Sequence, residues 1–448
     1  MAEYIIDDKK EKQSFCNIKE LEKELKSNFY IKDLSFSLIR LVFLKYVVDN
    51  CIGSENKDDL MYYSMLRNQI SRVAVGGGPN LLHPVFMCLE KKFNLKFTKK
   101  EKDQYIRLLF NLDEELLPIS YSYEGSEKLM KSLSKCNLEE IGSINEKGKE
   151  LALYLLGVMN TRSSGYRNTS NPSLREEAVE IAKEVLDVKD GDTLLDFAAG
   201  GGSEIISIAN GKDCNIVAYD SIEERCNTMT MLFIMMGYNN YNVKCKNEMS
   251  YSDSAEKADK IFTDVLKMEK LNYKSESSSI VINKTWQTLK DDGLAVVNLH
   301  SNFLFNETKY SIDYKKLLMN RKCVRAVVSL PINTYGSGSN IHLMVLTKNC
   351  LRNSILFVNG KTEAFSQYVV KEKNTTITNE GISLISNIIK ECREIEGLSR
   401  IVDYEEIEKN NFNLLPNAYV SDGIKEEDIS IEEIDWQLEK LYDELNKI

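Results

Sequence analysis

The sequence has few of the residue patterns that hold metals or disulfide frameworks together. It contains three histidines, and its ten cysteines are scattered along 448 residues without a C-x-x-C pair. Zinc sites and disulfide-rich domains are built from clustered cysteines and histidines. The sequence therefore predicts neither, no metal site is expected, and a reducing cytoplasm fits the cysteine usage best.

Long apolar runs are also missing. No stretch approaches the roughly 20 apolar residues that a membrane helix needs, and residues 1–13, MAEYIIDDKKEKQ, are charged where a signal peptide would be apolar. The net charge of −10 argues against nonspecific nucleic-acid binding by the chain as a whole. We expect a protein without membrane contact, in which any DNA binding is local or shared with a partner.

The length favours two or three domains, and a hydrophobic content of 43% is enough to build their cores. Residues 1–160 are predicted to form a helical N-terminal domain with little strand, in which the apolar segment 34–48 is a buried helix. The basic, turn-rich segment 161–173 leads into an α/β domain over 161–350. Residues 351–425 are predicted to extend that domain.

A final helix is predicted over 426–448, where Ile434, Leu438, Leu441 and Leu445 repeat at helical spacing. Such a face suits docking of a partner or a coiled-coil seam, and folding back onto the chain's own domain explains it equally well.

Residues 161–350 alternate strand and helix signals, which is typical of a doubly wound parallel sheet. Asn359-Gly360 is predicted to turn a hairpin within residues 354–365. The expected strands are Thr193–Phe197, Ile216–Tyr219, Lys260–Thr263, Leu294–Leu299, Ala326–Leu330 and Ile341–Thr347.

The most informative stretch is residues 191–220, which reads as strand, glycine turn, helix and strand. The first strand ends in Asp196, the turn is Ala198-Ala199-Gly200-Gly201-Gly202, a helix is expected over 203–209, and the next strand ends in Asp220. Adjacent parallel strands that each end in a carboxylate form a nucleotide-type crevice, and glycines let the backbone approach the ligand.

The spacing indicates which nucleotide is bound. A dinucleotide fold would need G-x-G-x-x-G, whereas Asp196, Gly200 and Gly202 form D-x-x-x-G-x-G, the arrangement of S-adenosylmethionine (SAM) methyltransferases. In this interpretation the turn, including Ala198, cradles the methionine part of SAM, and Asp220 accepts the ribose hydroxyls. A purely structural strand-to-helix turn is the alternative.

Several long segments resemble the methylase (modification) subunit of type I restriction-modification systems, in the adenine-specific DNA methyltransferase family. LVFLKYVVD (41–49) resembles the family's N-terminal helical domain, and DFAAGGG (196–202) stands at its SAM loop. LKDDGLAVVNLHSNFLF (289–305), VRAVVSLPINTYGSGSNIHLMVLTK (324–348) and SRIVDYEEIEKNNFNLLPNAYV (399–420) resemble its later segments in the same order. The resemblance implies SAM as cofactor and DNA adenine N6 as methyl acceptor.

The family's catalytic tetrapeptide, N/D-P-P-Y/F, corresponds here to Asp264-Val265-Leu266-Lys267. In the family the first side chain accepts a hydrogen bond from the target amine, and the aromatic ring stacks on the flipped adenine. Asp264 can still accept that bond, but both prolines and the ring are missing; stacking of this kind contributes about 1–3 kcal/mol per base. The family's short motif G-x-F-x-T-P is replaced here by a longer segment, residues 165–172. In this segment Tyr166 is a candidate for the aromatic residue beside SAM.

The remaining polar residues have mainly structural interpretations. His300 and His342 lie in apolar strand contexts and are expected to be satisfied core or loop residues. Tyr335, in a glycine- and serine-rich loop, is a candidate replacement for the lost stacking ring.

Three functional hypotheses follow. The first is a subunit that uses SAM to methylate adenine N6 in DNA, with Asp264 orienting the amine and a separate specificity subunit reading the sequence. The second is a catalytically inactive methyltransferase fold that serves as scaffold or DNA clamp for an active methylase paralogue. The third is a SAM methyltransferase with an acceptor other than DNA.

Overall fold

The computed structural model describes residues 174–421 except 239, 247–255, 266–273, 334–339, 351 and 372–374. Nearer the N-terminus it describes Lys23, Phe29–Ile31, Leu38, Ile39, Val42, Phe43, Leu116–Pro118, Ala152 and Leu155. The predicted tail helix, the segment 161–173 with Tyr166, and Tyr335 lie outside the described residues.

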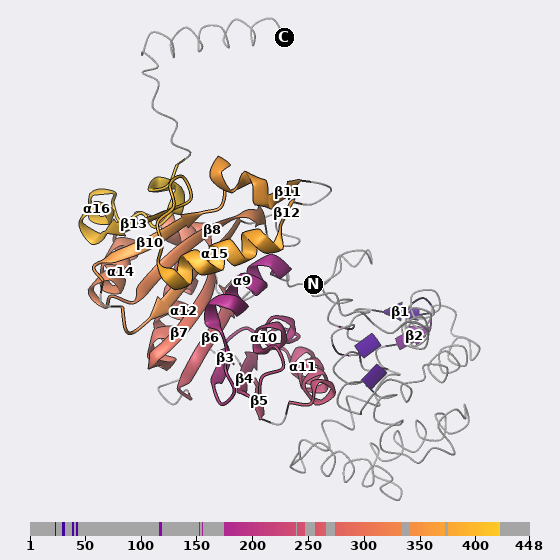
Figure 1. Cartoon of the computed structure of the whole chain (residues 1–448). Helices are drawn as coiled ribbons and strands as arrows, with labels where there is room; N and C mark the ends of the chain where they lie inside the picture. Colours follow the sequence, from indigo (N-terminus) through magenta and orange to yellow (C-terminus); the bar gives the residue numbers. More distant parts are fainter. Residues whose placement is uncertain are drawn as a thin grey trace, which may run out of the picture.

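A nine-stranded sheet forms the centre of the region from residue 174 to residue 421 (Figure 1). Across the sheet the strands follow the order β13-β10-β8-β9-β7-β6-β3-β4-β5. In chain order their bounds are β3 Thr193–Asp196, β4 Asn215–Asp220, β5 Tyr241–Cys245, β6 Ala258–Asp264, β7 Leu289–Leu299, β8 Val324–Asn333, β9 Asn340–Thr347, β10 Ser354–Asn359 and β13 Ser399–Asp403.

The five strands from β5 to β7 run parallel to one another. β9 is antiparallel to both of its neighbours, β7 and β8. Beyond β8 the sheet continues with β10, parallel to β8, and ends with β13, antiparallel to β10. The carboxyl ends of β4, β3, β6 and β7 therefore lie in a row along one edge, where a doubly wound sheet binds its ligand.

Helices cover both faces of this sheet. Their bounds are α9 Glu176–Leu186, α10 Ser203–Ala209, α11 Glu223–Met236, α12 Lys274–Thr288, α13 Ser301–Phe305, α14 Lys309–Asn320, α15 Asn379–Glu391 and α16 Tyr404–Lys409. Short 3-10 helices span Glu363–Tyr368 and Pro416–Ala418, and a small antiparallel pair joins β11 Val369–Lys371 to β12 Thr375–Ile377.

Alternating residues of the strands pack into two separate hydrophobic cores, one on each face of the sheet. Leu194 and Ile216 belong to a cluster that includes residues of α9, α10, α11 and α15. Leu195 and Val217, their neighbours in sequence, belong to a second cluster with residues of α12, α14 and α16. This alternation is what a strand buried on both faces requires, and it confirms the predicted Rossmann-like α/β fold.

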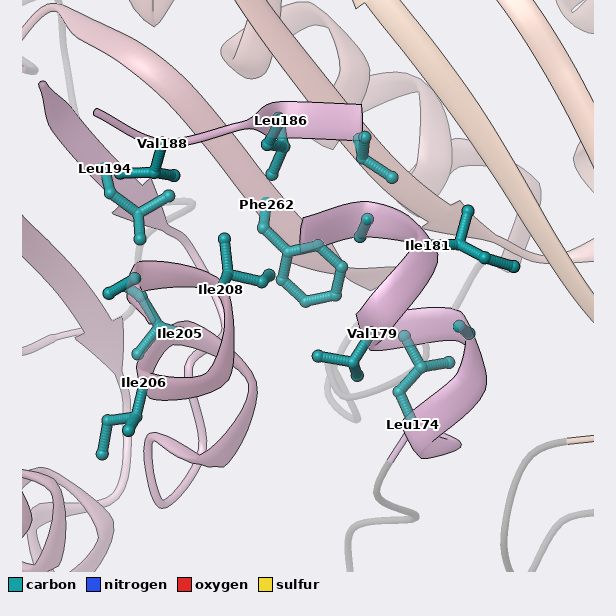
Figure 2. Close-up of a cluster of buried hydrophobic side chains, with 14 of the residues drawn as sticks. Leu174, Val179, Ile181, Leu186, Val188, Leu194, Ile205, Ile206, Ile208 and Phe262 are labelled. Carbon is teal, nitrogen blue, oxygen red and sulfur yellow. The ribbon is translucent and has the colours of Figure 1, made fainter. Parts of the chain in front are cut away.

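Phe262 of β6 connects the sheet to the first of these cores. Figure 2 shows its ring among labelled side chains of α9 and α10, including Val179, Ile205 and Ile208. The Phe262 side chain is fully buried. α9 packs in turn on α10 and α15, so one layer of helices rests on this part of the sheet (Figure 1).

The structure corrects the predicted hairpin within residues 354–365. β10 pairs with β8 on one side and with β13 on the other, so both of its edges are occupied. After Asn359 the chain turns into the 3-10 helix Glu363–Tyr368 instead of returning as a strand. Residues 354–359 and 399–403 thus belong to the same sheet as residues 193–347.

The N-terminal region contains a strand pair that the sequence did not predict. β1 Phe29–Ile31 pairs antiparallel with β2 Leu116–Pro118, far away in sequence. Four residues of the predicted buried helix 34–48 are described; all four are helical and buried, namely Leu38, Ile39, Val42 and Phe43.

We predict that Phe262→Ala lowers the free energy of unfolding by about 3–5 kcal/mol, because it removes a buried ring from between the sheet and two helices. Urea denaturation followed by circular dichroism measures the change. Ile280→Ala is the control, since Ile280 is exposed on α12 and should cost less than about 1 kcal/mol. Equal effects of the two substitutions would contradict the packing described here.

Candidate functional site

Four buried polar side chains stand in a row at the carboxyl ends of neighbouring strands. Asp220 ends β4, Asp196 ends β3, Asp264 ends β6, and Asn298 is the penultimate residue of β7. Their exposed fractions are 6%, 1%, 1% and 0%. Burying polar groups is costly unless they are hydrogen-bonded, so their partners determine what this edge can do.

Asp196 shapes the start of the glycine turn. Its Oδ1 accepts a hydrogen bond from the Ala198 N–H at 2.9 Å. The Gly202 N–H closes the turn on the Ala199 carbonyl, also at 2.9 Å. The Asp196 carboxylate therefore fixes the path of the chain as it leaves β3.

The turn favours glycine at two positions because Gly200 and Gly202 have φ angles of 58° and 90°. At Gly202 a Cβ atom would also lie 2.8 Å from Met229 Cγ on α11. The turn can pack this closely against α11 only without a side chain there.

Asp220 is joined directly to the glycine turn. Its Oδ2 accepts the Gly200 N–H at 3.1 Å, and its Oδ1 accepts the Ile222 N–H at 2.8 Å. Arg225 of α11 places its Nη1 3.8 Å from Asp220 Oδ2. Two backbone donors and one guanidinium thus hold the carboxylate whose predicted partner is a ribose.

Asp264 is joined to the next strand. Asn298 Nδ2 donates a hydrogen bond of 2.8 Å to Asp264 Oδ1, and the two residues are register partners in the β6–β7 pair. Asn298 Oδ1 is buried and has no hydrogen-bond partner within the part of the chain that the structure describes. Val265 is buried as well, while Leu266 and Lys267 lie outside the described residues.

The structure brings Asp196, Ala198, Gly200, Gly202 and Asp220 together around one turn, with Asp264 on the adjoining strand. Sequence reasoning missed Arg225 and Asn298. Asn298 carried a signal, because it is the one polar residue in LAVVNL (294–299). Arg225 carried none, since its place opposite Asp220 depends on the packing of α11.

A third missed residue, Glu204, follows the turn directly. It is buried, and its Oε1 accepts the Leu174 N–H at 3.3 Å while its Oε2 accepts the Ser203 hydroxyl at 2.7 Å. These bonds attach the chain just before α9 to the start of α10. Glu204 therefore holds Leu174 against the start of α10.

His342 has a structural role, in line with the sequence expectation. Its Nε2 lies 2.9 Å from Ser301 Oγ, and its Nδ1 lies 2.9 Å from Ser329 Oγ. Burial, with a smaller contribution from Lys361, lowers the pKa of His342 to about 4. The neutral imidazole of His342, on β9, thus connects the first residue of α13 to β8.

Within the part of the chain that the structure describes, no three histidine, cysteine, aspartate or glutamate side chains are grouped so that they would hold a metal ion. None of the described helices is long and apolar enough to cross a membrane.

Residues 208–428 match the family model described as N-6 DNA Methylase. The match includes Asp220, Asp264 and Asn298 but begins after the glycine turn, so the turn is supported by its own geometry.

Two similar proteins are type I restriction enzyme methylase subunits. The MjaVIII subunit of Methanocaldococcus jannaschii is 26% identical over 310 residues, covering 60% of this chain and 52% of that protein. The MpnII subunit of Mycoplasma pneumoniae is 22% identical over 408 residues, covering 81% and 74%. The chain thus spans about half the length of the first relative and about three quarters of the second.

Two solved structures share the fold. The type I restriction-modification methyltransferase subunit from Streptococcus thermophilus has a TM-score of 0.65 at 15% identity, covering 91% of this chain and 99% of that one. A structure on complex assembly and conformational transition of the type I system has a TM-score of 0.63 at 14% identity, covering 98% and 97%.

We predict that the protein loses stability between pH 6.5 and pH 4 through His342. Its pKa is about 4 in the folded chain and about 6.5 when unfolded, so the stabilisation is present above pH 6.5 and disappears as the pH falls, by roughly 3 kcal/mol in all. His342→Gln removes this titration, so its unfolding free energy should depend less on pH in that window. Equal pH dependence in both proteins would refute the assignment.

Proposed function

We infer that the chain belongs to the N-6 DNA methylase family, and on that premise we propose that it is a methylase-type subunit that binds SAM and methylates adenine N6 in DNA together with a separate recognition subunit. The observation that carries the proposal is the bond from the Gly200 N–H to Asp220 Oδ2. It joins the glycine turn to the acid of the next strand, as a nucleotide crevice at adjacent strand ends requires.

The residues of this edge fit SAM chemically. The cofactor has a charged methionine part, a ribose with two hydroxyl donors, and an adenine ring. The turn from Ala198 to Gly202 presents backbone close to the ligand, and Asp220 is the carboxylate that the ribose hydroxyls would use. Asp196 holds the turn in shape through Ala198. Tyr166 is proposed as an aromatic beside the cofactor.

Asp264 is the residue that supports the adenine amine as the methyl acceptor. Bound SAM supplies an electrophilic methyl group, and the chain has to present the adenine amine to it. In this proposal Asp264 at the end of β6 accepts a hydrogen bond from that amine and so orients the nitrogen lone pair. Asn298 keeps the Asp264 carboxylate in place through its 2.8 Å bond.

The partner assignment follows from relatives that are subunits of type I restriction enzymes. A solved structure of similar fold concerns assembly of the type I restriction-modification system. The net charge of −10 is unfavourable for DNA binding by the chain alone. We therefore assign DNA contact to a complex in which a specificity subunit selects the sequence.

A second candidate function is a methyltransferase fold that pairs with an active methylase without catalysing transfer itself. Its supporting observation is the state of Asp264, which is 1% exposed and bonded to Asn298. The residue after it is valine, where the family has the first of two prolines. If Asp264 keeps its hydrogen bond to Asn298, it only connects β6 to β7. The chain would then serve as a scaffold or as half of a DNA clamp.

We predict that Asp220→Ala weakens SAM binding at least about tenfold, the loss expected for one charge-assisted hydrogen bond. Equilibrium dialysis with labelled SAM measures the dissociation constant. Asp213→Ala is the matched control, because Asp213 lies just before β4, at the opposite end of the strand, and is exposed. If Asp220→Ala has a native circular dichroism spectrum and binds SAM with unchanged affinity, Asp220 does not bind the ribose.

We predict further that, in complex with its recognition subunit and DNA, the wild-type chain transfers methyl groups and Asp264→Ala does not. Asp264→Asn is the informative second variant, since it keeps an acceptor oxygen and should retain part of the rate. Transfer of labelled methyl groups from SAM to DNA is the measurement. SAM binding without any transfer by the wild-type complex would support the second candidate instead.

A further inference from the structure

Two cysteines flank the backbone carbonyl of Asp220. Cys226 lies in the first turn of α11, and Cys245 is the last residue of β5. Both are free thiols, and the carbonyl accepts from the Cys226 thiol and from the N–H of the residue after Cys245. Cys245 and Asp220 are also register partners in the β4–β5 pair.

Both cysteines belong to segments that hold Asp220. The Cys226 thiol donates to the Asp220 carbonyl at 3.5 Å, and the Lys246 N–H, directly after Cys245, donates to the same oxygen at 2.8 Å. The residue before Cys226 is Arg225, which faces the Asp220 carboxylate. Any change in the distance between Cys226 and Cys245 therefore moves groups that position this acid.

The two thiols differ in access. Cys245 is exposed, whereas Cys226 is buried with 3% of its surface exposed. An external reagent can reach Cys245 first, and Cys226 then stands next to the sulfur that has reacted. This is the arrangement of an attacking and a resolving cysteine.

We propose that Cys226 and Cys245 form a reversible disulfide that draws the start of α11 toward β5, disturbs Asp220 and lowers the affinity for SAM. The coupling to SAM rests on the proposed role of Asp220 in binding the ribose. The disulfide itself does not depend on that role.

The reaction is a thiol–disulfide exchange with a small disulfide such as oxidised glutathione. The Cys245 thiolate attacks one sulfur, which forms a mixed disulfide and releases one glutathione thiolate that takes up a proton. The Cys226 thiolate then attacks the Cys245 sulfur and releases the second glutathione. Two protein thiols are oxidised by two electrons, and one glutathione disulfide is reduced to two thiols.

The surroundings make this exchange slow at neutral pH. Burial raises the pKa of both thiols, and the carboxylates of Glu223 and Asp220 add to the effect at Cys245. The neighbouring Cys226 side chain partly opposes the increase in the pKa of Cys245, so Cys245 is the thiol that ionises more easily. Exchange should accelerate as the pH rises, because the thiolate is the reacting form.

The test treats the full-length chain with excess oxidised glutathione at mildly alkaline pH, followed by peptide mapping and titration with SAM. We expect an intramolecular Cys226–Cys245 bond and SAM affinity that falls about tenfold, the effect of losing one charge-assisted hydrogen bond. Dithiothreitol should restore the affinity. Cys245→Ser keeps every other cysteine and should bind SAM equally well with and without the oxidant.

Two results would overturn the inference. One is a mapped product in which Cys226 and Cys245 are not bonded to each other, for example glutathione or a second chain on Cys245. The other is the mapped bond with unchanged SAM affinity, which would remove the coupling. A reduced chain that binds no SAM would instead contradict the proposed function, and the mapping would still decide whether the disulfide forms.

Discussion

The bond between the Gly200 N–H and the Asp220 carboxylate is the contact on which the rest of the site depends. A buried carboxylate is tolerated only where donors surround it, and here they come from the glycine turn, from Ile222 and from Arg225. Each donor belongs to a different segment around the end of β4. Asp220 thus organises the turn. The turn favours glycines because its backbone adopts positive φ angles and, at Gly202, packs against Met229.

The central strands and the glycine turn could be predicted because they depend on local sequence. The helix expected over 203–209 matches α10, and all six expected strands are present. β5 was missed because YNVKC (241–245) is a partly exposed edge strand without a clear apolar pattern. The hairpin at Asn359-Gly360 was wrong for a tertiary reason: the Gly360 N–H donates to Ser329 of β8, and Asn359 Nδ2 donates to Val420. The direction of β9 had no local signal either.

At the proposed acceptor side the sequence predicted Asp264 as a candidate but did not predict its environment. The methylase family that the chain resembles has prolines after this position. Here the Asp264 carboxylate instead accepts a hydrogen bond from Asn298, its register partner on β7. This pair follows from sheet register, which single-sequence reasoning does not supply. The two proposed functions share the proposed SAM site and differ in whether Asp264 would leave the bond to Asn298 on binding DNA.

Calorimetric titration of the purified, reduced chain with SAM is the decisive measurement for the proposed cofactor site. We expect saturable binding of one SAM per chain, with a dissociation constant well below millimolar. Absence of heat up to millimolar SAM, from a chain with a native circular dichroism spectrum, would contradict it. The edge formed by Asp196, Gly200 and Asp220 would then be a structural remnant, and the fold would have been retained for assembly.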